Sequence, residues 1–521
     1  MRLPKNPLLL FTVFISGATV MSTEMGASRL LAPYYGTSLL IWAALIGLVL
    51  LFLTVGYTIG GRLADRHPTP QALYKVTAWG GFTIVLVPIL SQPFLTWSIE
   101  GFSSFSAGIF FGSLISILVL FSLPLLLLGM VSPWAIRLRT ESVSASGSAA
   151  GSLYALSTVG SLVGTFGSVL LLQPAIGTRA SIWAFGILLL VVSLAGLTRA
   201  VGRRAVPYAA MLGVAVVLVL LFNGGGIREA AAGELLYEDE SPYNYIQVTQ
   251  ENGWNQLILN EGHAVHSMYR PDRLLTGGPW DYFLLAPLFR PQGVSEPLQN
   301  VLLIGLAAGT VSNQYAQVYP AARMDGVEID GQIVEVGKKY FGMNQPQLNP
   351  VVADGRYFLL TTQQKYDVIG IDAYRQPYIP FHLATTEFFE TARAKLNPGG
   401  VVAINAGRTP GDYRLVNALG VTMDSVFPTV FVVDTERYLN SLIFATSEPM
   451  TVEQFVRNAA AVQDPYLRTV VQAAYESGTL TRLQDRSWYD ISHKPFTDDL
   501  APVERVIDQI IVDYATGQGD R

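Results

Sequence analysis

The chain has 521 residues, enough for more than one domain, and a mean hydropathy of +0.36, which is high for a purely soluble protein. Only 14% of its residues are charged, and a formal net charge of −5 without a basic tract argues against a nucleic-acid partner. There is no cysteine, which excludes disulfides, thiolate metal sites and cysteine nucleophiles, and with five scattered histidines we expect no metal site.

Long apolar runs fill the chain up to about residue 222. We predict seven membrane spans of roughly 20 residues, the length that crosses a bilayer, at 8–28, 38–60, 74–95, 110–132, 151–174, 180–198 and 205–222. Small residues recur inside them, as in Gly151-Ser152, Gly160-Ser161 and Gly164, and let helices approach closely in lipid. The sequence therefore predicts a multi-pass helical membrane domain over residues 1–225, with the lipid bilayer as a partner.

The distribution of lysine and arginine in the short loops predicts an orientation. One side holds Arg2, Lys5, Arg62, Arg66, Lys75, Arg137, Arg139, Arg199, Arg203 and Arg204. The other side holds little besides Arg29 and Arg179. This asymmetry predicts an inner-membrane protein with a cytoplasmic N-terminus and, after seven spans, a C-terminal domain on the outer, periplasmic side. A cytoplasmic C-terminal domain is the alternative if one span is miscounted.

Two ionisable residues, Glu24 and Arg29, lie at the end of the first apolar run. Charged groups near a membrane are candidates for function. The alternative is that both lie at the edge of the helical bundle, where they pair with each other or reach the interface.

Hydropathy falls and charge returns after the last apolar run. Tyr243–Val248 and Gln256–Leu259 flank an Asn252-Gly253 pair, which is typical of a β-hairpin. We expect a small β-subdomain over residues 226–292 that ends in a helix at about 277–290. The tail, residues 451–521, is amphipathic and predicts a C-terminal helical segment.

Residues 293–450 contain four short apolar runs that each end in glycine or a carboxylate. The runs lead into Gly305, Glu328, Asp354 and Asp372, with helix-length spacers between the first three. This alternation predicts a Rossmann-like α/β domain, with a parallel sheet and its ligands at the carboxyl ends of the strands.

The ends of the first three runs predict a nucleoside site. Gly305 and Gly309 frame a turn that lets the backbone approach a ligand, although packing alone also explains such glycines. Glu328, followed by Ile329, is placed to clamp a ribose diol, with an exposed strand-end charge as the alternative. Asp354-Gly355 is placed to accept from an adenine amine, with a simple turn as the alternative.

Two missing motifs narrow the class of donor. The chain has no P-loop lysine and no Gly-x-Gly-x-x-Gly spacing after the first strand. This favours a nucleoside without phosphates, such as a donor of the S-adenosyl type. Asp372 then ends the fourth strand, where a carboxylate can hold an incoming amine and take its proton, unless it serves only as a loop cap.

Residues 235–445 resemble the spermidine synthase (polyamine aminopropyltransferase) family. The likeness rests on Ser241-Pro242-Tyr243-Asn244, Leu257–Gly262, 301–309, Val327–Asp330, Ala353–Gly355 and Tyr366–Asp372. The order of β-subdomain and methyltransferase-type sheet also agrees. Together with the apolar half, the chain is similar to the membrane-integral, transporter-fused branch of that family.

The resemblance implies a reaction. The co-substrate would be decarboxylated S-adenosylmethionine, with no permanently bound cofactor, and the acceptor would be putrescine or a related diamine or polyamine. The products would be spermidine and methylthioadenosine. The soluble members of the family form dimers, which implies a homodimer here.

The resemblance also implies roles for individual residues. Glu328 would hold the ribose, Asp354 with Gly355 the adenine, and Asp372 would accept the amine proton. Asp281 would bind the far amine of the acceptor. The remaining candidates lie where the family has donor-side glutamines or on the substrate side: Asn244 and His266 for the donor, and Tyr243 and Tyr374 for the acceptor.

Two positions depart from the family. Ala308 stands where the family has an aspartate that holds the aminopropyl ammonium, and Arg375 stands where it has a second acid of the catalytic loop. An aspartate at position 308 would repel the carboxylate that intact S-adenosylmethionine carries. Its replacement by Ala308 therefore favours a first alternative, an S-adenosylmethionine-dependent methyltransferase. A second alternative is a sensor or transporter that binds polyamine without converting it.

Overall fold

The structure is a computed structural model that describes residues 6–35, 39–102, 108–140, 146–223, 228–230, 232–260, 264–375, 378–435, 437–476 and 480–515. Arg2, Lys5 and Gly262, which the sequence analysis used, lie outside these residues. The chain divides into two compact units, one formed by Met1–Glu229 and Glu238–Tyr245 and the other by Ala230–Tyr237 and Ile246–Arg521.

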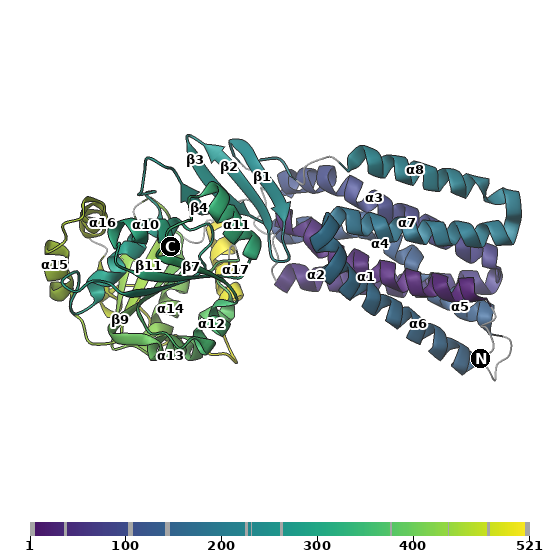
Figure 1. The fold of residues 1–521 in the computed structure, drawn as a ribbon. Helices are drawn as coiled ribbons and strands as arrows, with labels where there is room; N and C mark the ends of the chain where they lie inside the picture. Colours follow the sequence, from purple (N-terminus) through teal and green to yellow (C-terminus); the bar gives the residue numbers. More distant parts are fainter. Residues whose placement is uncertain are drawn as a thin grey trace. The chain divides into compact units, whose positions relative to one another are not determined.

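The first unit is built from long helices that lie side by side (Figure 1). In chain order they are α1 (Pro7–Tyr35), α2 (Leu39–Arg66), α3 (Pro70–Phe102), α4 (Gly108–Gly129), α5 (Val131–Arg139), α6 (Ser146–Phe166), the π-helix η2 (Gly167–Leu172), α7 (Gln173–Val201), the 3-10 helix η3 (Gly202–Ala205) and α8 (Val206–Phe222). The most extensive contacts are between α3 and α7, α1 and α6, and α2 and α4.

Glycines let α1 and α6 touch backbone to backbone. A Cβ at Gly160 or Gly164 would lie 2.1 Å from the carbonyl oxygen of Phe14 or Ala18, respectively. A Cβ at Gly17 would lie 2.3 Å from the carbonyl oxygen of Ser157. The predicted close packing of small residues is therefore confirmed for Gly160 and Gly164, whereas Gly151 has open space around it.

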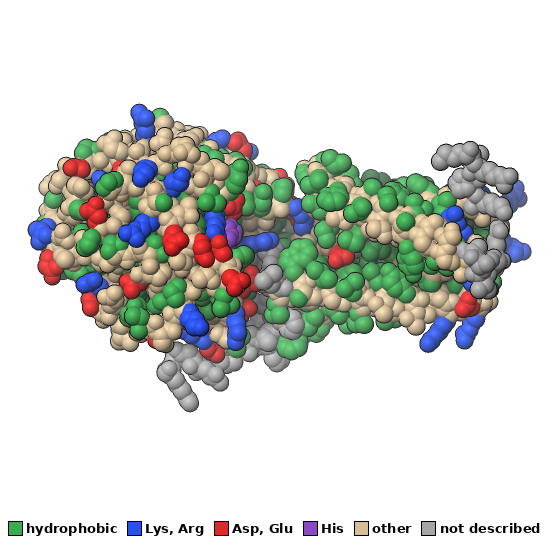
Figure 2. Space-filling model, turned by 90° about the horizontal axis from the view of Figure 1, so that it is seen from below, with side chains coloured by type: hydrophobic (Ala, Val, Ile, Leu, Met, Phe, Trp, Pro, Cys, Tyr) green, Lys and Arg blue, Asp and Glu red, His purple; other side chains and the backbone are tan. Residues whose placement is uncertain are grey.

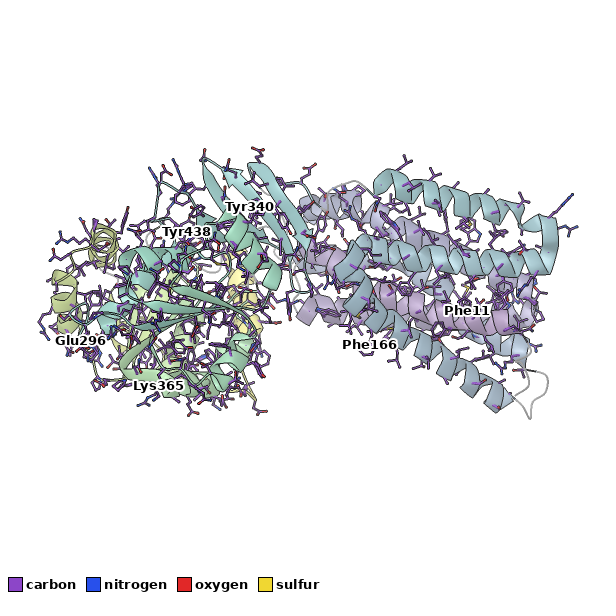
Figure 3. The ribbon with its side chains drawn as sticks, viewed as in Figure 1. Phe11, Phe166, Glu296, Tyr340, Lys365 and Tyr438 are labelled. Atoms are coloured by element: carbon purple, nitrogen blue, oxygen red, sulfur yellow. The ribbon has the colours of Figure 1, made fainter. Side chains whose placement is uncertain are left out.

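The surface of the helical unit is apolar. Leu170, Leu171, Leu220 and Leu221 are each at least 65% exposed, and further large apolar side chains such as Phe11 and Phe166 (Figure 3) are also exposed. Figure 2 shows mainly hydrophobic side chains on the face of this unit that is in view, whereas acidic and basic side chains are spread over the second unit. An exposed apolar surface of this extent is typical of a membrane domain.

Five helical stretches within the described residues are long and apolar enough to cross a membrane, judged by length and composition. They are Pro7–Tyr35, Leu40–Arg66, Pro70–Ser98, Phe111–Arg139 and Ser146–Phe222. The last stretch has 77 residues and contains α6, α7 and α8. The count of seven spans and the sidedness stay predictions.

Arg29 contacts backbone groups that are distant in sequence. Its two terminal nitrogens donate to the carbonyl oxygens of Ser241 and Pro242, each at 2.9 Å. Ser241 Oγ in turn accepts from the backbone N–H groups of Tyr243 and Asn244, at 3.0 and 2.8 Å. Arg29 therefore anchors the turn at 241–244 to the end of α1.

A four-stranded sheet in the order β1-β2-β3-β4 follows the helices along the chain. It is formed by β1 (Glu234–Glu240), β2 (Tyr245–Glu251), β3 (Trp254–Leu259) and β4 (Val265–Tyr269). β2 and β3 pair antiparallel through a two-residue turn. Both turn residues have positive φ, 52° at Asn252 and 81° at Gly253, as the tight turn of a hairpin requires. The predicted hairpin is confirmed.

An eight-stranded sheet forms the centre of the second unit. Its strands are β5 (Asn300–Ile304), β6 (Arg323–Glu328), β7 (Leu348–Val352), β8 (Tyr366–Ile371), β9 (Leu396–Gly407), β10 (Thr429–Asp434), β11 (Asn440–Thr446) and β12 (Thr481–Arg482), in the order β12-β10-β11-β9-β8-β5-β6-β7. β5 to β9 run parallel, whereas β11 pairs antiparallel with β9 and β10. The predicted Rossmann-like sheet is confirmed.

Helices cover both faces of this sheet (Figure 1). Leu302 and Ile304 point to a core shared with α12 (Gly355–Thr361), α13 (Thr386–Ala394), α14 (Arg414–Asp424) and α17 (Val503–Ala515). Val301 and Leu303 point to a core shared with α10 (Thr310–Val318), α11 (Gly331–Tyr340), α15 (Val452–Ala460) and α16 (Pro465–Glu476). The alternation of strand side chains between the two faces produces the two cores.

The helix predicted at about 277–290 is mostly a 3-10 helix. A single α-turn, α9 (Pro279–Tyr282), is followed by the 3-10 helix η4 (Phe283–Phe289). Pro287 lacks the N–H that an α-helix would direct at the carbonyl of Phe283, and the hydroxyl of Tyr315 donates to that carbonyl instead, at 2.7 Å. The C-terminal tail also differs from the prediction, because its short strand β12 extends the sheet next to β10.

Candidate active site

The glycine-rich turn after β5 lies in the middle of the carboxyl edge of the sheet. Gly305 has a φ of 82°, and a Cβ there would lie 2.4 Å from the carbonyl oxygen of Asp372. Gly305 therefore lets the end of β5 lie directly against the end of β8. Gly309, with a φ of 92°, begins α10. The backbone requires glycine at both positions. The turn brings Gly305 and Asp372, which end the first and fourth predicted runs, together.

Glu328 ends β6 beside this turn, and its side chain is 8% exposed. One carboxylate oxygen accepts from the N–H of Ala307 at 2.9 Å and the other from the N–H of Asp330 at 3.1 Å. Burial raises the pKa of Glu328 to about 7, opposed by these backbone N–H groups. Ile329 follows with its side chain 39% exposed, so that an apolar surface flanks the carboxylate.

Asp354 follows β7 and caps α12. One of its oxygens accepts from the backbone N–H of Tyr357 at 2.9 Å, and the other lies 3.0 Å from Nε2 of His382. A Cβ on Gly355 would lie 2.3 Å from Cγ2 of Ile304, so this position also has to be glycine for the turn to pack against β5. Asp354 therefore serves as a helix cap and also contacts a histidine.

Asp372 follows β8 at the centre of the same edge. Its Oδ1 accepts from Nδ2 of Asn405 at 2.9 Å, and the indole N–H of Trp280 also donates to the carboxylate. Burial raises the pKa of Asp372 to about 6, and the two donors oppose that shift. Asn440 donates to Oδ1 of Asn405 at 2.9 Å, which fixes the amide so that its nitrogen faces Asp372. The result is a positioned carboxylate whose pKa lies above that of an ordinary aspartate.

His266 lies in β4, the strand that contacts the glycine-rich turn. Its neighbour Ser267 accepts from the N–H of Ala308 at 3.0 Å, and Met268 N–H donates to Thr310 Oγ1 at 2.8 Å. Nε2 of His266 is buried and has no hydrogen-bond partner among the residues that the structure describes, and burial lowers the pKa of the ring to about 4. The imidazole is therefore neutral at physiological pH.

Asp281 and Tyr374 have their polar atoms engaged within the protein. The carboxylate of Asp281 accepts from Thr276 N–H, Thr276 Oγ1, Gly277 N–H and Gln314 Nε2, at 2.6 to 3.0 Å. Burial raises its pKa, and these four bonds oppose the shift. The hydroxyl of Tyr374 donates to Asn405 O at 2.9 Å and accepts from Gly407 N–H at 3.0 Å. Asp281 braces the turn that carries Trp280, and Tyr374 ties the segment after Asp372 to β9.

Tyr243 and Asn244 belong to the first unit, in the turn that Arg29 anchors. Tyr243 is 50% exposed. Their roles toward donor and acceptor stay predictions.

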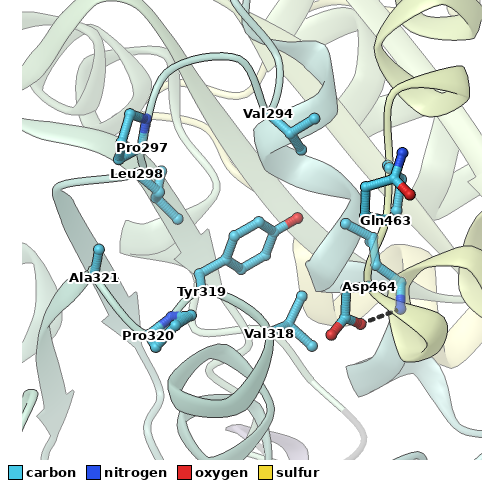
Figure 4. Close-up of a pocket in the computed structure, with 11 residues that line it drawn as sticks. Val294, Pro297, Leu298, Val318, Tyr319, Pro320, Ala321, Gln463 and Asp464 are labelled. Carbon is cyan, nitrogen blue, oxygen red and sulfur yellow. Dashed lines mark hydrogen bonds between the residues drawn. The ribbon is translucent and has the colours of Figure 1, made fainter.

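A cavity of about 250 Å³ lies at the opposite edge of the sheet (Figure 4). It is lined by residues that precede β5 and β6 and by the turn before α16, with Tyr319 in its middle: Val294, Pro297, Leu298, Val318, Tyr319, Pro320, Ala321, Val462, Gln463, Asp464 and Leu467. None of the predicted site residues lines it. In the part of the chain that the structure describes, no cluster of three or more histidine, aspartate or glutamate side chains could hold a metal.

Three residues that contact the predicted carboxylates were not recognised from the sequence. Trp280 and Asn405 bind Asp372, and His382 contacts Asp354. Asn405 lies near the end of β9, the buried strand next to β8, so the placement of a polar residue there was a usable signal. Trp280 lies in α9 and His382 in the short 3-10 helix η5 (Phe381–Leu383), both outside the parallel strands, and no local pattern marks them.

Comparison with known proteins identifies similar sequences. Residues 291–456 match the model of the spermine/spermidine synthase domain. A probable polyamine aminopropyl transferase of Bifidobacterium longum is 34% identical over 328 residues, which cover 60% of this chain and 71% of that protein. A polyamine aminopropyltransferase of Vibrio vulnificus is 31% identical over 209 residues, which cover 37% of this chain and 65% of that protein.

Solved structures give weaker matches. A spermidine synthase in complex with the transition-state analogue AdoDATO aligns with a TM-score of 0.39 and 19% identity, covering 46% of this chain and 85% of that one. A probable spermidine synthase from Corynebacterium glutamicum aligns with a TM-score of 0.37 and 18% identity, covering 47% of this chain and 95% of that one.

Proposed function

This chain belongs to the spermine/spermidine synthase (polyamine aminopropyltransferase) family and is a transferase, and we propose that it moves the aminopropyl group of decarboxylated S-adenosylmethionine to an amine such as putrescine. The products would be spermidine and methylthioadenosine. The observation that carries the proposal is the partly buried carboxylate of Asp372, held by Asn405 and Trp280 at the carboxyl edge of the sheet.

The donor would bind on the β6–β7 side of this edge. Glu328 accepts the ribose hydroxyls with the lone pairs that Ala307 and Asp330 leave free, since a carboxylate offers about four acceptor sites. Asp354 and Gly355 face the adenine, and exposed Ile329 provides an apolar surface for the base. Neutral His266, beside the glycine-rich turn, adds a polar atom on the donor side without repelling the sulfonium.

The reaction would take place at Asp372. The acceptor nitrogen attacks the aminopropyl carbon attached to the sulfonium, a C–N bond forms, and the C–S bond breaks with its electron pair going to sulfur. The new ammonium loses a proton to the Asp372 carboxylate, which its pKa of about 6 keeps ionised at neutral pH. Because the sulfonium is already a good leaving group, catalysis would come from positioning and proton removal.

The test is to incubate the purified full chain with putrescine and each adenosyl donor separately, and to identify the nucleoside product by mass spectrometry. Methylthioadenosine supports aminopropyl transfer. Adenosylhomocysteine supports methyl transfer. The absence of both rules out both reactions with this acceptor.

One observation favours methyl transfer as a second candidate. Ala308 is fully buried among apolar side chains such as Ile246, Leu257 and Ile333, so position 308 supplies no acid toward the donor. A donor that keeps its carboxylate would meet no repulsion from this position. The two donors in the experiment above separate this candidate from the first.

We also propose that the helical unit lies in the cell membrane, with the N-terminus in the cytoplasm and the catalytic domain on the outer side. The apolar surface and five long apolar stretches support membrane attachment, and the loop charges support the orientation. Cleavage of the C-terminal domain by protease added to intact spheroplasts is the expected result. Cleavage only after lysis would place that domain inside. The implied homodimer is tested by the mass of the detergent-solubilised protein.

A further inference from the structure

The carboxylate of Asp354 receives hydrogen bonds at both of its oxygens, from two different segments of the chain. Oδ1 accepts from the backbone N–H of Tyr357 at 2.9 Å, and Oδ2 lies 3.0 Å from Nε2 of His382. Because a carboxylate oxygen only accepts hydrogen bonds, Nε2 of His382 is the donor in this pair. The two donors fix the orientation of the carboxylate and leave its other lone pairs free.

His382 is itself held in place through its backbone. Nη1 of Arg356 donates to the carbonyl oxygen of His382 at 3.1 Å, and the same guanidinium forms a bidentate ion pair with Asp498, at 2.7 and 2.6 Å. The hydroxyl of Thr385 also donates to Oδ1 of Asp498, at 2.8 Å. Asp498 lies beyond residue 456, where the matched family domain ends. The C-terminal segment therefore helps to hold the histidine that donates to Asp354.

The Asp354–His382 pair is accessible to a ligand. The side chain of Asp354 is 36% exposed and that of His382 is 33% exposed. Aromatic side chains are exposed beside the pair, namely Phe381, whose ring lies edge-on to His382 at 5.7 Å between centroids, and Tyr357. An acceptor-only carboxylate next to aromatic surface suits a flat ring that carries an N–H donor at its edge. An adenine, with its 6-amino group, has this form.

We propose that His382 is a positioning residue for the base of the adenosyl donor. By fixing the carboxylate of Asp354, it directs the free lone pairs toward the 6-amino group and so sets the preference for a 6-aminopurine over a purine without that group. The proposal rests on the proposed function, which places the adenine at Asp354. His382 acts through Asp354 and need not touch the nucleoside.

The experiment measures, by calorimetry, how the purified full chain binds methylthioadenosine and the analogue that lacks the 6-amino group. His382→Phe keeps an aromatic ring but removes the hydrogen-bond donor to Asp354. It should raise the Kd of methylthioadenosine about fivefold, because the carboxylate no longer holds the orientation that the amino group needs. The Kd of the analogue should stay within about twofold of wild type, since the analogue offers Asp354 no donor.

Two further variants separate positioning from damage to the fold. His382→Gln offers a side-chain N–H in place of Nε2–H and should restore the ratio of the two Kd values to within about twofold of wild type. His493→Phe is the matched control, because His493 also lies edge-on to a phenylalanine, Phe496, at 5.7 Å between centroids, but it lies beside Asp490. This control should leave both Kd values unchanged.

Asp498→Asn tests the contribution of the C-terminal segment. An amide has one oxygen, so it cannot accept both hydrogen bonds from Arg356, and the hold on His382 is weakened. The preference for methylthioadenosine should fall about threefold. Adding the change to His382→Phe should lower the preference no further, because both changes act on the same carboxylate. An additive loss would overturn the link between Asp498 and His382.

These binding measurements do not depend on the reaction. An unchanged preference in His382→Phe, or equal weakening of both nucleosides, would overturn the role of His382. If wild-type protein binds methylthioadenosine but forms none from decarboxylated S-adenosylmethionine and putrescine, the proposed function fails while the binding data still test His382. If wild-type protein binds neither nucleoside, the base does not lie at Asp354, and the role of His382 is refuted as well.

Discussion

The two halves of the carboxyl edge hold their carboxylates in different ways. On the donor half, Glu328 and Asp354 accept from backbone N–H groups of adjoining turns and helix ends. On the acceptor half, Asp372 accepts from the side chains of Asn405 and Trp280, which belong to other elements. The half proposed for the donor is therefore built mainly by local backbone geometry, whereas the half proposed for the acceptor depends on tertiary packing.

This difference indicates where function can vary. Backbone donors stay in place when neighbouring side chains change, so recognition of the ribose is insensitive to substitution around it. Side-chain donors such as Trp280 and Asn405 can be replaced by other side chains. Such replacements allow the same scaffold to use a different acceptor amine. The two halves should accordingly respond differently to mutation and to pH.

The largest effect is expected for Asp372→Asn. Removing the base should lower kcat by about 10²- to 10⁴-fold, the usual contribution of general base catalysis. Binding of methylthioadenosine, measured by calorimetry, should stay within about threefold of wild type, because the donor half is intact. A variant with normal kcat would remove Asp372 from its proposed role, and a comparable loss of nucleoside binding would break the division into two halves.

Glu328→Gln should act on the donor alone. The amide has only one oxygen that can accept, so it cannot keep both hydrogen bonds from the N–H groups of Ala307 and Asp330. It also loses the charge that strengthens hydrogen bonds to the ribose. Bonds to a charged group are worth about 1.5–3 kcal/mol, so the donor KM should rise about 10- to 100-fold while kcat at saturating donor is largely kept. Glu335→Gln, at an exposed position of α11, is the control. A fall in kcat alone would contradict the assignment.

The sequence was sufficient to predict the sheet and to bring its strand-end residues to one edge. Gly305, Glu328, Asp354 and Asp372 each follow a short apolar run, and parallel strands bring such ends to one edge. Gly305 shows why the pattern is reliable, since the backbone of Asp372 leaves no room for a Cβ there.

The remaining features depend on contacts that no local pattern encodes. Trp280 reaches Asp372 because Asp281 braces the preceding turn, and η4 departs from an α-helix because Pro287 lacks a donor and tyrosines from α10 bind its carbonyls. The packing of α17 on α14 likewise joins two segments that are far apart in the sequence.

The pH dependence should separate the two halves. Asp372, with a pKa of about 6, must be ionised to accept a proton, so kcat/KM for the acceptor should fall about tenfold per unit at pH values below 6. Glu328, with a pKa of about 7, becomes neutral earlier on acidification, so kcat/KM for the donor should begin to fall near pH 7. Initial rates from pH 5 to 9 measure both. In Glu328→Gln the fall in kcat/KM for the donor near pH 7 should vanish, and the fall in kcat/KM for the acceptor near pH 6 should stay. If both values of kcat/KM fall together at the same pH, the separation of the two halves is contradicted.

The smallest effect is expected for Trp280→Phe, which keeps an aromatic ring but removes the N–H that binds Asp372. Loss of one hydrogen bond should lower kcat about two- to tenfold. Because that bond favours the ionised carboxylate, its removal should raise the pKa of Asp372 and move the acid limb of kcat/KM for the acceptor to higher pH. The donor limb near 7 should not move, since Glu328 receives its bonds from the backbone. A purely structural role for Trp280 would lower activity equally at all pH values. A shift of the acid fall in kcat/KM to higher pH therefore distinguishes positioning of the base from packing.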